Sequence, residues 1–216
     1  MTFKDRLDAG QKLAQVLQKY KNAPNTIILA LPRGGVVIGF KVAEALNLPL
    51  DIVVPRKIGA PGNPEFAIGA ITETGEGIFD EQTIAAYGIN QSYLDNEIAK
   101  EKIEAERRRK LYRGTRPPLD LKNKNVVIVD DGLATGLTMR AAIKTVKLYG
   151  AAKIIVAIPV TPPDTAKLIK KEVDELIYLD APAFFGAVGA FYEEFGQTMD
   201  EEVVSLLQQS EKFGKE

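Results

Sequence analysis

The stretch Val126-Val127-Ile128-Val129-Asp130-Asp131-Gly132-Leu133-Ala134-Thr135-Gly136-Leu137-Thr138 decides how this chain is expected to fold. Its first four residues are apolar and mostly β-branched, which predicts a buried strand, and two acids follow where that strand ends. A turn of small residues comes next and leads into an amphipathic segment, which predicts a helix. Strand, turn and helix in this order are typical of α/β proteins with parallel strands.

Outward from this stretch, short apolar runs alternate with amphipathic segments along the whole chain. Buried parallel strands have such continuous apolar runs because helices cover both of their faces. We expect strands at residues 26–31, 51–54, 67–72, 125–129, 153–160 and 175–179. We expect helices at residues 36–46, 80–88, 92–113 and 164–172, one from Met139 to its end at Gly150, and a last one opened by a capping box, Thr198-x-x-Glu201.

This order predicts the α/β class, with an open, mostly parallel twisted sheet, flanking helices and a small hood. A length of 216 residues suits one large domain. We place its core at residues 22–180 and the hood in the segments 73–118 and 181–216. Ligands of open α/β sheets bind at the carboxyl ends of the strands, so functional residues are expected there.

The composition excludes several kinds of chemistry. The chain has no cysteine and no histidine, which excludes disulfides, thiolate zinc sites, cysteine nucleophiles and a Ser-His-Asp triad. Carboxylates, Lys, Arg, hydroxyls, backbone amides and oxygen-bound Mg²⁺ remain. The formal net charge of −1 does not draw the chain to nucleic acid or to an anionic membrane. An apolar signal core and membrane-length runs are missing from the sequence, so we expect a cytoplasmic protein.

The turn Gly132–Thr138 suits a phosphate group. Its glycines let backbone N–H groups converge on an anion, the following helix N-terminus adds partial positive charge, and Thr135 and Thr138 add hydroxyl donors. Asp130 and Asp131 would repel a bare phosphate, so we expect them to face ligand hydroxyls or a hydrated Mg²⁺. A ribose 5-phosphate has this polarity. A turn that used Gly and Thr only for capping and packing would leave the two acids unexplained.

Two more loops follow expected strands. Leu31-Pro32-Arg33-Gly34-Gly35 follows the first strand, its glycines allow close backbone approach, and Arg33 supplies charge for an anion. Arg56-Lys57 opens a Gly/Pro-rich loop through Pro64 after the second strand, which suits a mobile lid over an anionic leaving group. A generic strand–helix turn and a solvated surface pair are the alternative interpretations of these two loops.

Taken together, these motifs resemble those of the type I phosphoribosyltransferases, whose motif for phosphoribosyl pyrophosphate (PRPP) has four apolar residues, two acids and a Gly/Thr-rich turn. The form Asp-Asp-x-x-Ala-Thr-Gly-x-Thr is most similar to that of the adenine branch. The hypoxanthine-guanine branch carries an Asp, proposed as general base, where Ala134 stands here, so that role is absent. With Tyr112-Arg113-x-x-Arg116-Pro117, the chain also resembles a subfamily of predicted phosphoribosyltransferases with unassigned acceptor.

The resemblance implies an enzyme of nucleotide metabolism that transfers 5-phosphoribosyl from PRPP to a nitrogen of a nucleobase-like acceptor and releases pyrophosphate. It implies that Gly132–Thr138 holds the 5′-phosphate and that Asp130 and Asp131 bind the ribose hydroxyls and, through water, Mg²⁺. The pyrophosphate would meet a set of loop residues: Arg33, Gly34, Gly35, Arg56 and Lys57. A homodimer is compatible with this interpretation.

Residues 180–195 hold five of the sixteen aromatic residues (nine Phe and seven Tyr). We expect four of them to form a hood that stacks a planar acceptor: Phe184, Phe185, Phe191 and Tyr192. An oligomer contact and ordinary core packing are the alternatives. The basic run Arg107–Lys110 is expected on a solvated helix face, with a dimer contact or an acceptor-phosphate contact as the alternative.

Two other functions share parts of this pattern. A PRPP-sensing regulator on the same fold would bind PRPP without turnover; such regulators usually carry a DNA-binding module or a basic face, and this chain shows neither clearly. A phospho-receiver-like domain also has paired acids at strand ends. It needs a phosphoacceptor Asp at the end of another central strand, where this chain has Leu31-Pro32-Arg33.

Overall fold

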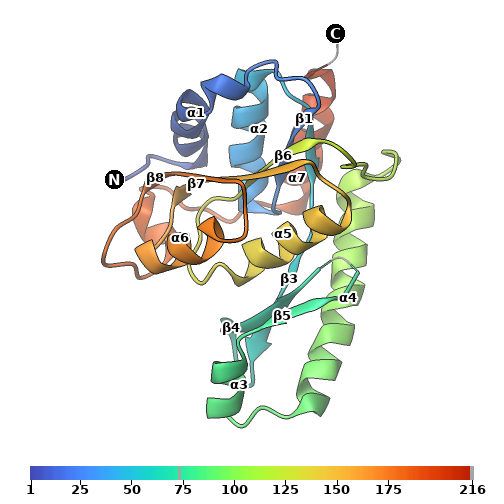
Figure 1. The fold of residues 1–216 in the computed structure, drawn as a ribbon, viewed down its shortest axis with the longest axis vertical. Coiled ribbons are helices and arrows are strands. Elements are labelled where there is room, and N and C mark those ends of the chain that lie inside the picture. Colours follow the sequence, from blue (N-terminus) through green and yellow to red (C-terminus); the bar gives the residue numbers. More distant parts are fainter. Residues whose placement is uncertain (73, 215–216) are drawn as a thin grey trace.

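The main sheet is the centre of the structure, a computed structural model that describes residues 1–72 and 74–214 (Figure 1). Its strand order is β2-β1-β6-β7-β8, and all neighbouring strands are parallel. The strands are β1 (Thr26–Ala30), β2 (Leu50–Ile52), β6 (Asn125–Val129), β7 (Lys153–Val160) and β8 (Glu175–Asp180). The open parallel α/β sheet predicted from the sequence is confirmed.

Helices cover both faces of this sheet. They are α1 (Arg6–Val16), α2 (Gly34–Leu46) and α7 (Asp200–Gln209) on one face, and α5 (Leu137–Leu148) and α6 (Pro163–Lys170) on the other. In strand β6, successive side chains point to opposite faces of the sheet. Val127 and Val129 pack in the hydrophobic cluster of the first face, and Val126 and Ile128 pack in that of the second. Burial on both faces explains the continuous apolar runs in the sequence. Three short 3₁₀ helices complete this part: η1 (Gln18–Tyr20), η2 (Val188–Phe191) and η3 (Ser210–Lys212).

Helix α1 was not expected from the sequence. Its buried face is a narrow stripe of small and medium residues, Ala9, Leu13 and Ala14 among them, which gives a weak periodic signal. Asp5 caps it, because the backbone N–H of Asp8 donates to Asp5 Oδ1 at 2.8 Å. This cap places Arg6 at the first position of the helix.

The start of α7 corrects one expectation. The N-cap residue is Met199 and makes no side-chain capping hydrogen bond, so the predicted capping box Thr198-x-x-Glu201 is wrong. Thr198 lies one position before the cap and is buried. The helix instead begins with three acids, Asp200 to Glu202, whose charges favour a helix N-terminus.

A second, antiparallel sheet forms an appendage below α5 in Figure 1. Its strands are β3 (Arg56–Ala60), β4 (Asn63–Ile71) and β5 (Gly77–Phe79), in the order β3-β4-β5. One prediction is wrong here: the Gly/Pro-rich stretch through Pro64 pairs as strands rather than forming a loop. The strand predicted at residues 67–72 is present as the second part of β4, but it pairs within this sheet and not within the main one. Register shifts on either side of Gly59 accommodate the Gly- and Pro-rich sequence within the hairpin.

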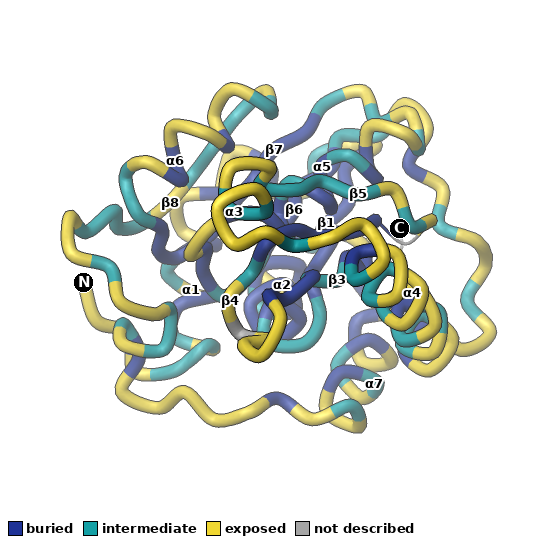
Figure 2. The backbone as a smooth tube through the Cα atoms, turned by 90° about the horizontal axis from the view of Figure 1, so that it is seen from below, coloured by how far each residue is buried: buried dark blue, intermediate teal, exposed yellow. Residues whose placement is uncertain are grey.

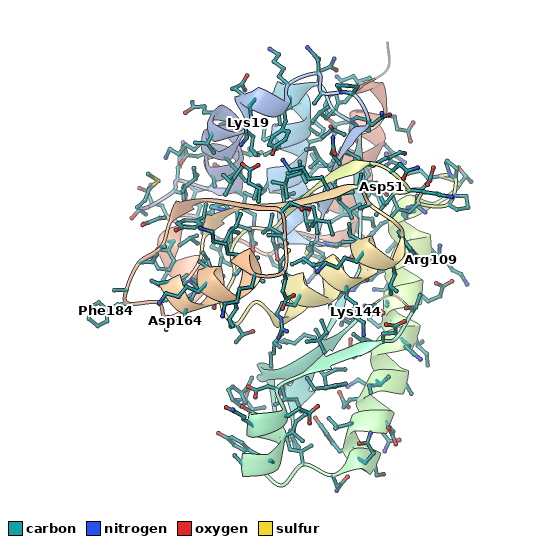
Figure 3. All side chains as sticks on the ribbon, in the orientation of Figure 1. Lys19, Asp51, Arg109, Lys144, Asp164 and Phe184 are labelled. Atoms are coloured by element: carbon teal, nitrogen blue, oxygen red, sulfur yellow. The ribbon has the colours of Figure 1, made fainter. Side chains whose placement is uncertain are left out.

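Helices α3 (Glu81–Ala86) and α4 (Gln91–Arg113) complete the appendage. Because the appendage includes β3, it begins near Arg56 and not at residue 73, where we placed the first boundary of the hood from the sequence. A small core of Ile58, Ile68, Ile71 and Leu94 holds it together. On the core side, Lys144 of α5, labelled in Figure 3, lies with its Nζ 3.0 Å from Glu76 Oε2.

Burial differs between the two parts. Viewed from the appendage side, the main-sheet strands β1, β6 and β7 are almost wholly buried, whereas the edge strand β8, α3 and α4 are largely exposed or half-buried (Figure 2). Within the described residues, no helix combines the length and the apolar character needed to cross a bilayer.

Candidate functional site

The acids Asp130 and Asp131 lie at the carboxyl edge of the main sheet, directly after β6. Strand β6 is the neighbour of β1, with Val129 opposite Ala30 in the register. Parallel neighbours end at the same edge, so the loop that follows β1 lies beside the acids.

The contact between this loop and the acids is close. A Cβ atom at Gly34 would lie 2.0 Å from Asp131 Oδ2, and one at Gly35 would lie 2.9 Å from Asp130 Oδ1. Only residues without a side chain allow the start of α2 to approach both carboxylates this way. The peptide bond between Pro32 and Arg33 in the same loop is cis. The structure thus brings together two motifs that the sequence placed only at the ends of two separate strands.

Arg6 is a partner of Asp131 that the sequence did not reveal. Its Nε donates a hydrogen bond to Asp131 Oδ2 at 2.8 Å, and the two side chains are only 12% and 16% exposed. Its Nη1 donates to the carbonyl of Gly196 at 2.7 Å, and its guanidinium carbon lies 3.9 Å from the centre of the Phe195 ring. Arg6 and Asp131 are 125 positions apart, so no motif spacing could have linked them.

The turn Gly132–Thr138 has the strand–turn–helix geometry expected for an anion site. Gly136 adopts a φ of +77° immediately before α5, a conformation that favours glycine. Ala134 and Thr135 are exposed at the tip, while the hydroxyl of Thr165 on α6 donates to the carbonyl of Ala134 at 2.6 Å. The turn is therefore anchored by a neighbouring helix and open to solvent at its tip.

The aromatic segment does not form the single stacking surface that we expected. Tyr192 is buried in the core, and its hydroxyl donates to the backbone carbonyl of Asp131 at 2.6 Å. Phe185 and Phe191 pack on each other with ring centres 4.9 Å apart. Phe184 is 94% exposed and projects away from the molecule in Figure 3. The ring of Tyr192 packs in the core and its hydroxyl contacts the backbone of Asp131, so Tyr192 does not belong to an exposed stacking surface.

The two acids differ in their electrostatic surroundings. Burial raises the pKa of Asp130 well above its usual range, and the neighbouring charge of Asp131 raises it further. Burial also raises the pKa of Asp131, but the Arg6 guanidinium acts in the opposite direction. A pair of crowded carboxylates favours ligands that donate hydrogen bonds or carry positive charge.

A metal ion at this site would need oxygens from elsewhere. In the parts of the chain that the structure describes, no three acidic side chains gather as a ready-made metal site. Two neighbouring carboxylates nevertheless suit Mg²⁺, which keeps several water molecules and takes further oxygens from phosphate groups of a substrate.

The three cations predicted to meet pyrophosphate have different environments. Arg33 lies in the loop beside the acids, with its Nη1 3.6 Å from Asp200 Oδ1. Arg56 donates from its Nε to Glu101 on α4 at 2.6 Å. Lys57 is half-buried on β3, opposite Ala70, a residue that packs against α5. Arg56 and Lys57 therefore belong to a paired strand and not to an irregular loop, and closure of this hairpin over a ligand stays a prediction.

Comparison with known proteins connects this geometry to a family. The family model of the phosphoribosyl transferase domain matches residues 3–193. The chain belongs to the phosphoribosyl transferase family. The matched range includes α1, the glycine loop beside the acids, and the acids themselves.

Two of the proteins that resemble this chain are similar over nearly its whole length. A protein of Mycobacterium tuberculosis (strain CDC 1551 / Oshkosh) named "Putative phosphoribosyl transferase" is 40% identical over 210 residues, which cover 97% of this chain and 47% of that protein. The crystal structure of TT1426 from Thermus thermophilus has 41% identity and a TM-score of 0.77, with 97% of this chain and 99% of that chain covered. The chain thus spans about half the length of the curated mycobacterial relative.

Proposed function

We propose that this phosphoribosyl transferase family member binds PRPP and transfers its 5-phosphoribosyl group to a nitrogen of a nucleobase-like acceptor, with release of pyrophosphate. The observation that carries the proposal is the contact of Gly34 and Gly35 with the carboxylates of Asp131 and Asp130. PRPP bears its pyrophosphate on the carbon next to a hydroxyl-bearing carbon. A site for this donor therefore needs an anion-binding loop that lies against groups which accept hydrogen bonds from hydroxyls. The glycine loop and the two acids lie together in this way at the strand ends.

Each part of the donor has a matching part of the site in this proposal. The exposed tip of the Gly132–Thr138 turn, followed by the N-terminus of α5, suits the 5′-phosphate. Asp130 and Asp131 accept hydrogen bonds from the ribose hydroxyls. Arg33 and the backbone at Gly34 meet the pyrophosphate, because they lie on the loop that touches the acids.

The proposed reaction needs little covalent chemistry from the protein. The bond between the anomeric carbon and a pyrophosphate oxygen breaks through an oxocarbenium-like state, a bond to the acceptor nitrogen forms, and the nitrogen loses its proton to solvent. The side chains hold donor and acceptor in line and neutralise charge on the leaving group. Mg²⁺, held by Asp130 and Asp131 through water, would supply additional positive charge to the pyrophosphate.

Calorimetric titration with PRPP and Mg²⁺ tests the donor assignment. The double variant Asp130→Asn/Asp131→Asn should bind PRPP about 100-fold more weakly, because each substitution removes a negative charge and replaces one acceptor oxygen with an N–H₂ donor. The matched control is Asp164→Asn, at a side chain that is 91% exposed on α6. Unchanged affinity in the double variant, with its circular dichroism spectrum intact, would show that the site assignment is wrong.

Release of pyrophosphate in the presence of a panel of purine and pyrimidine bases tests the transfer step. Release that depends on one base identifies the acceptor class. PRPP binding without release for any base would instead assign the protein to the PRPP-sensing regulators on this fold.

A further inference from the structure

We propose that Arg6 is a positioning residue of the donor site, which fixes the Asp131 carboxylate for the ribose and ties the segment Phe195–Gly196 to it. This inference rests on the proposed function, because it assigns a role in PRPP binding to a residue outside the expected motifs. It also makes the first turn of α1 part of the site.

The contacts of Arg6 lead to this role. Its guanidinium group contacts Asp131 through Nε, the carbonyl of Gly196 through Nη1 and the Phe195 ring through its flat face. A Cβ atom at Gly34 would lie 2.7 Å from Arg6 Nε, so the guanidinium also borders the glycine loop. One planar group therefore touches the acid, the anion loop and the segment that leads from β8 to α7.

Arginine suits this position because of its geometry. The guanidinium group is planar, stays charged, and presents several N–H donors in a fixed arrangement while its face stacks on an aromatic ring. Lysine has a single ammonium group and cannot hold a carboxylate, a carbonyl and a ring face in the same arrangement. The three contacts thus depend on the shape of the side chain as well as on its charge.

The charge of Arg6 determines the direction of the expected effect. Asp130 and Asp131 are adjacent and half-buried, and PRPP carries several negative charges. Like charges repel strongly where water is largely excluded, and Arg6 offsets one of the two acids. Removal of Arg6 should therefore weaken donor binding. If Arg6 merely obstructed Asp131, its removal would strengthen binding.

Titration calorimetry with PRPP and Mg²⁺ tests this role in three single variants. Arg6→Gln should bind PRPP roughly tenfold more weakly than the unsubstituted chain, and Arg6→Lys should also bind more weakly, by roughly threefold or more. The control is Lys12→Gln on the same helix, whose Nζ pairs with Asp8 Oδ2 at 2.7 Å, and it should bind as the unsubstituted chain does. Thermal unfolding establishes that each variant is folded, and Arg6→Lys serves if Arg6→Gln is not.

A double-mutant cycle separates positioning from a general structural role. If Arg6 acts through Asp131, then Arg6→Gln/Asp131→Asn should bind PRPP no more weakly than Asp131→Asn alone. Fully additive losses, or an Arg6→Gln variant that binds PRPP as well as or better than the unsubstituted chain, would overturn the inference. If the unsubstituted chain itself does not bind PRPP, the proposed function fails instead, so the two failures are distinguishable.

Discussion

Arg113 and Asp51 form a two-pronged ion pair, with 3.0 Å between Nε and Oδ1 and 2.8 Å between Nη2 and Oδ2. Arg113 is the last residue of α4, and Asp51 lies in β2, the edge strand of the main sheet. The two side chains are 7% and 13% exposed. The long helix of the appendage is therefore fastened to the core by a buried pair of charges.

The loss of this pair should lower stability strongly. Asp51→Asn should lower the free energy of unfolding by about 3 kcal/mol, because it removes the negative charge that both N–H groups of the buried Arg113 contact. Asp164→Asn should change the free energy by no more than about 0.5 kcal/mol, because its pair with Lys167 is exposed. Urea unfolding measures both values, and equal losses in the two variants would contradict the role assigned to the buried pair.

Tyr112 should make stability depend on alkaline pH. Its hydroxyl donates to Asp200 Oδ1 at 2.5 Å, and burial, followed by this hydrogen bond, raises the pKa of Tyr112 from 10.0 to about 12. A raised pKa in the folded state means that the contribution is fully present below pH 10 and is lost as the pH rises to about 12. Tyr112→Phe should therefore show a smaller fall in unfolding free energy across that interval.

Urea unfolding at the two ends of the interval measures this fall. Tyr178→Phe, at a side chain that is 44% exposed, is the control and should show the fall seen in the unsubstituted chain. The same fall in all three proteins would remove Tyr112 as its source.

Gly34 should not tolerate a side chain. A Cβ atom there would lie 2.0 Å from Asp131 Oδ2, so Gly34→Ala must displace a carboxylate that Arg6 holds in place. We expect PRPP affinity to fall by at least about tenfold and the free energy of unfolding to fall by about 1–3 kcal/mol. Gly186→Ala is the matched control, because a Cβ at Gly186 would have no neighbour within 4 Å. Calorimetry measures the PRPP affinity and urea unfolding measures the free energy of unfolding. Equal values for Gly34→Ala and Gly186→Ala would contradict the prediction.

Phe184 and Phe185 are adjacent but should respond differently to truncation. Phe184 is 94% exposed, so Phe184→Ala should change the free energy of unfolding by less than about 0.5 kcal/mol. Phe185 packs on Phe191 and on the core, so Phe185→Ala should lower it by about 1–2 kcal/mol. Chemical denaturation of the pair checks the assignment, and a large loss at Phe184 would indicate that it is covered in solution.

Much of the fold could be predicted because its strands have strong local signals. The four apolar residues of β6 and the longer run of β7 are buried on both faces, and burial of this kind requires continuous apolar sequence. The glycine-rich turns were also recognisable, because both follow a strand and precede a helix. Their contact at the acids follows from β1 and β6 being neighbours, which the apolar pattern alone did not specify.

Other features could not be predicted, because they depend on contacts between residues far apart in the sequence. The hairpin of β3 and β4 is stabilised by packing against α4 and α5, which overrides the low strand preference of its Gly and Pro residues. Tyr192 looked like a candidate stacking residue because composition does not distinguish a buried ring from an open one. Arg6 had no signal, because its partners Asp131 and Gly196 are 125 and 190 positions away.

These separations have a consequence for how the candidate site forms as the chain folds. Contacts between distant parts of a chain form slowly, because a large loop must close before they are made. Arg6 contacts both Asp131 and Gly196, so two large loops must close before both contacts are made. A partly folded chain in which only β6 and its turn have formed would lack these contacts. Under the proposed function, PRPP would bind only where these parts of the chain have come together, and by mass action it would stabilise α1, β6 and the segment before α7 as one cooperative unit.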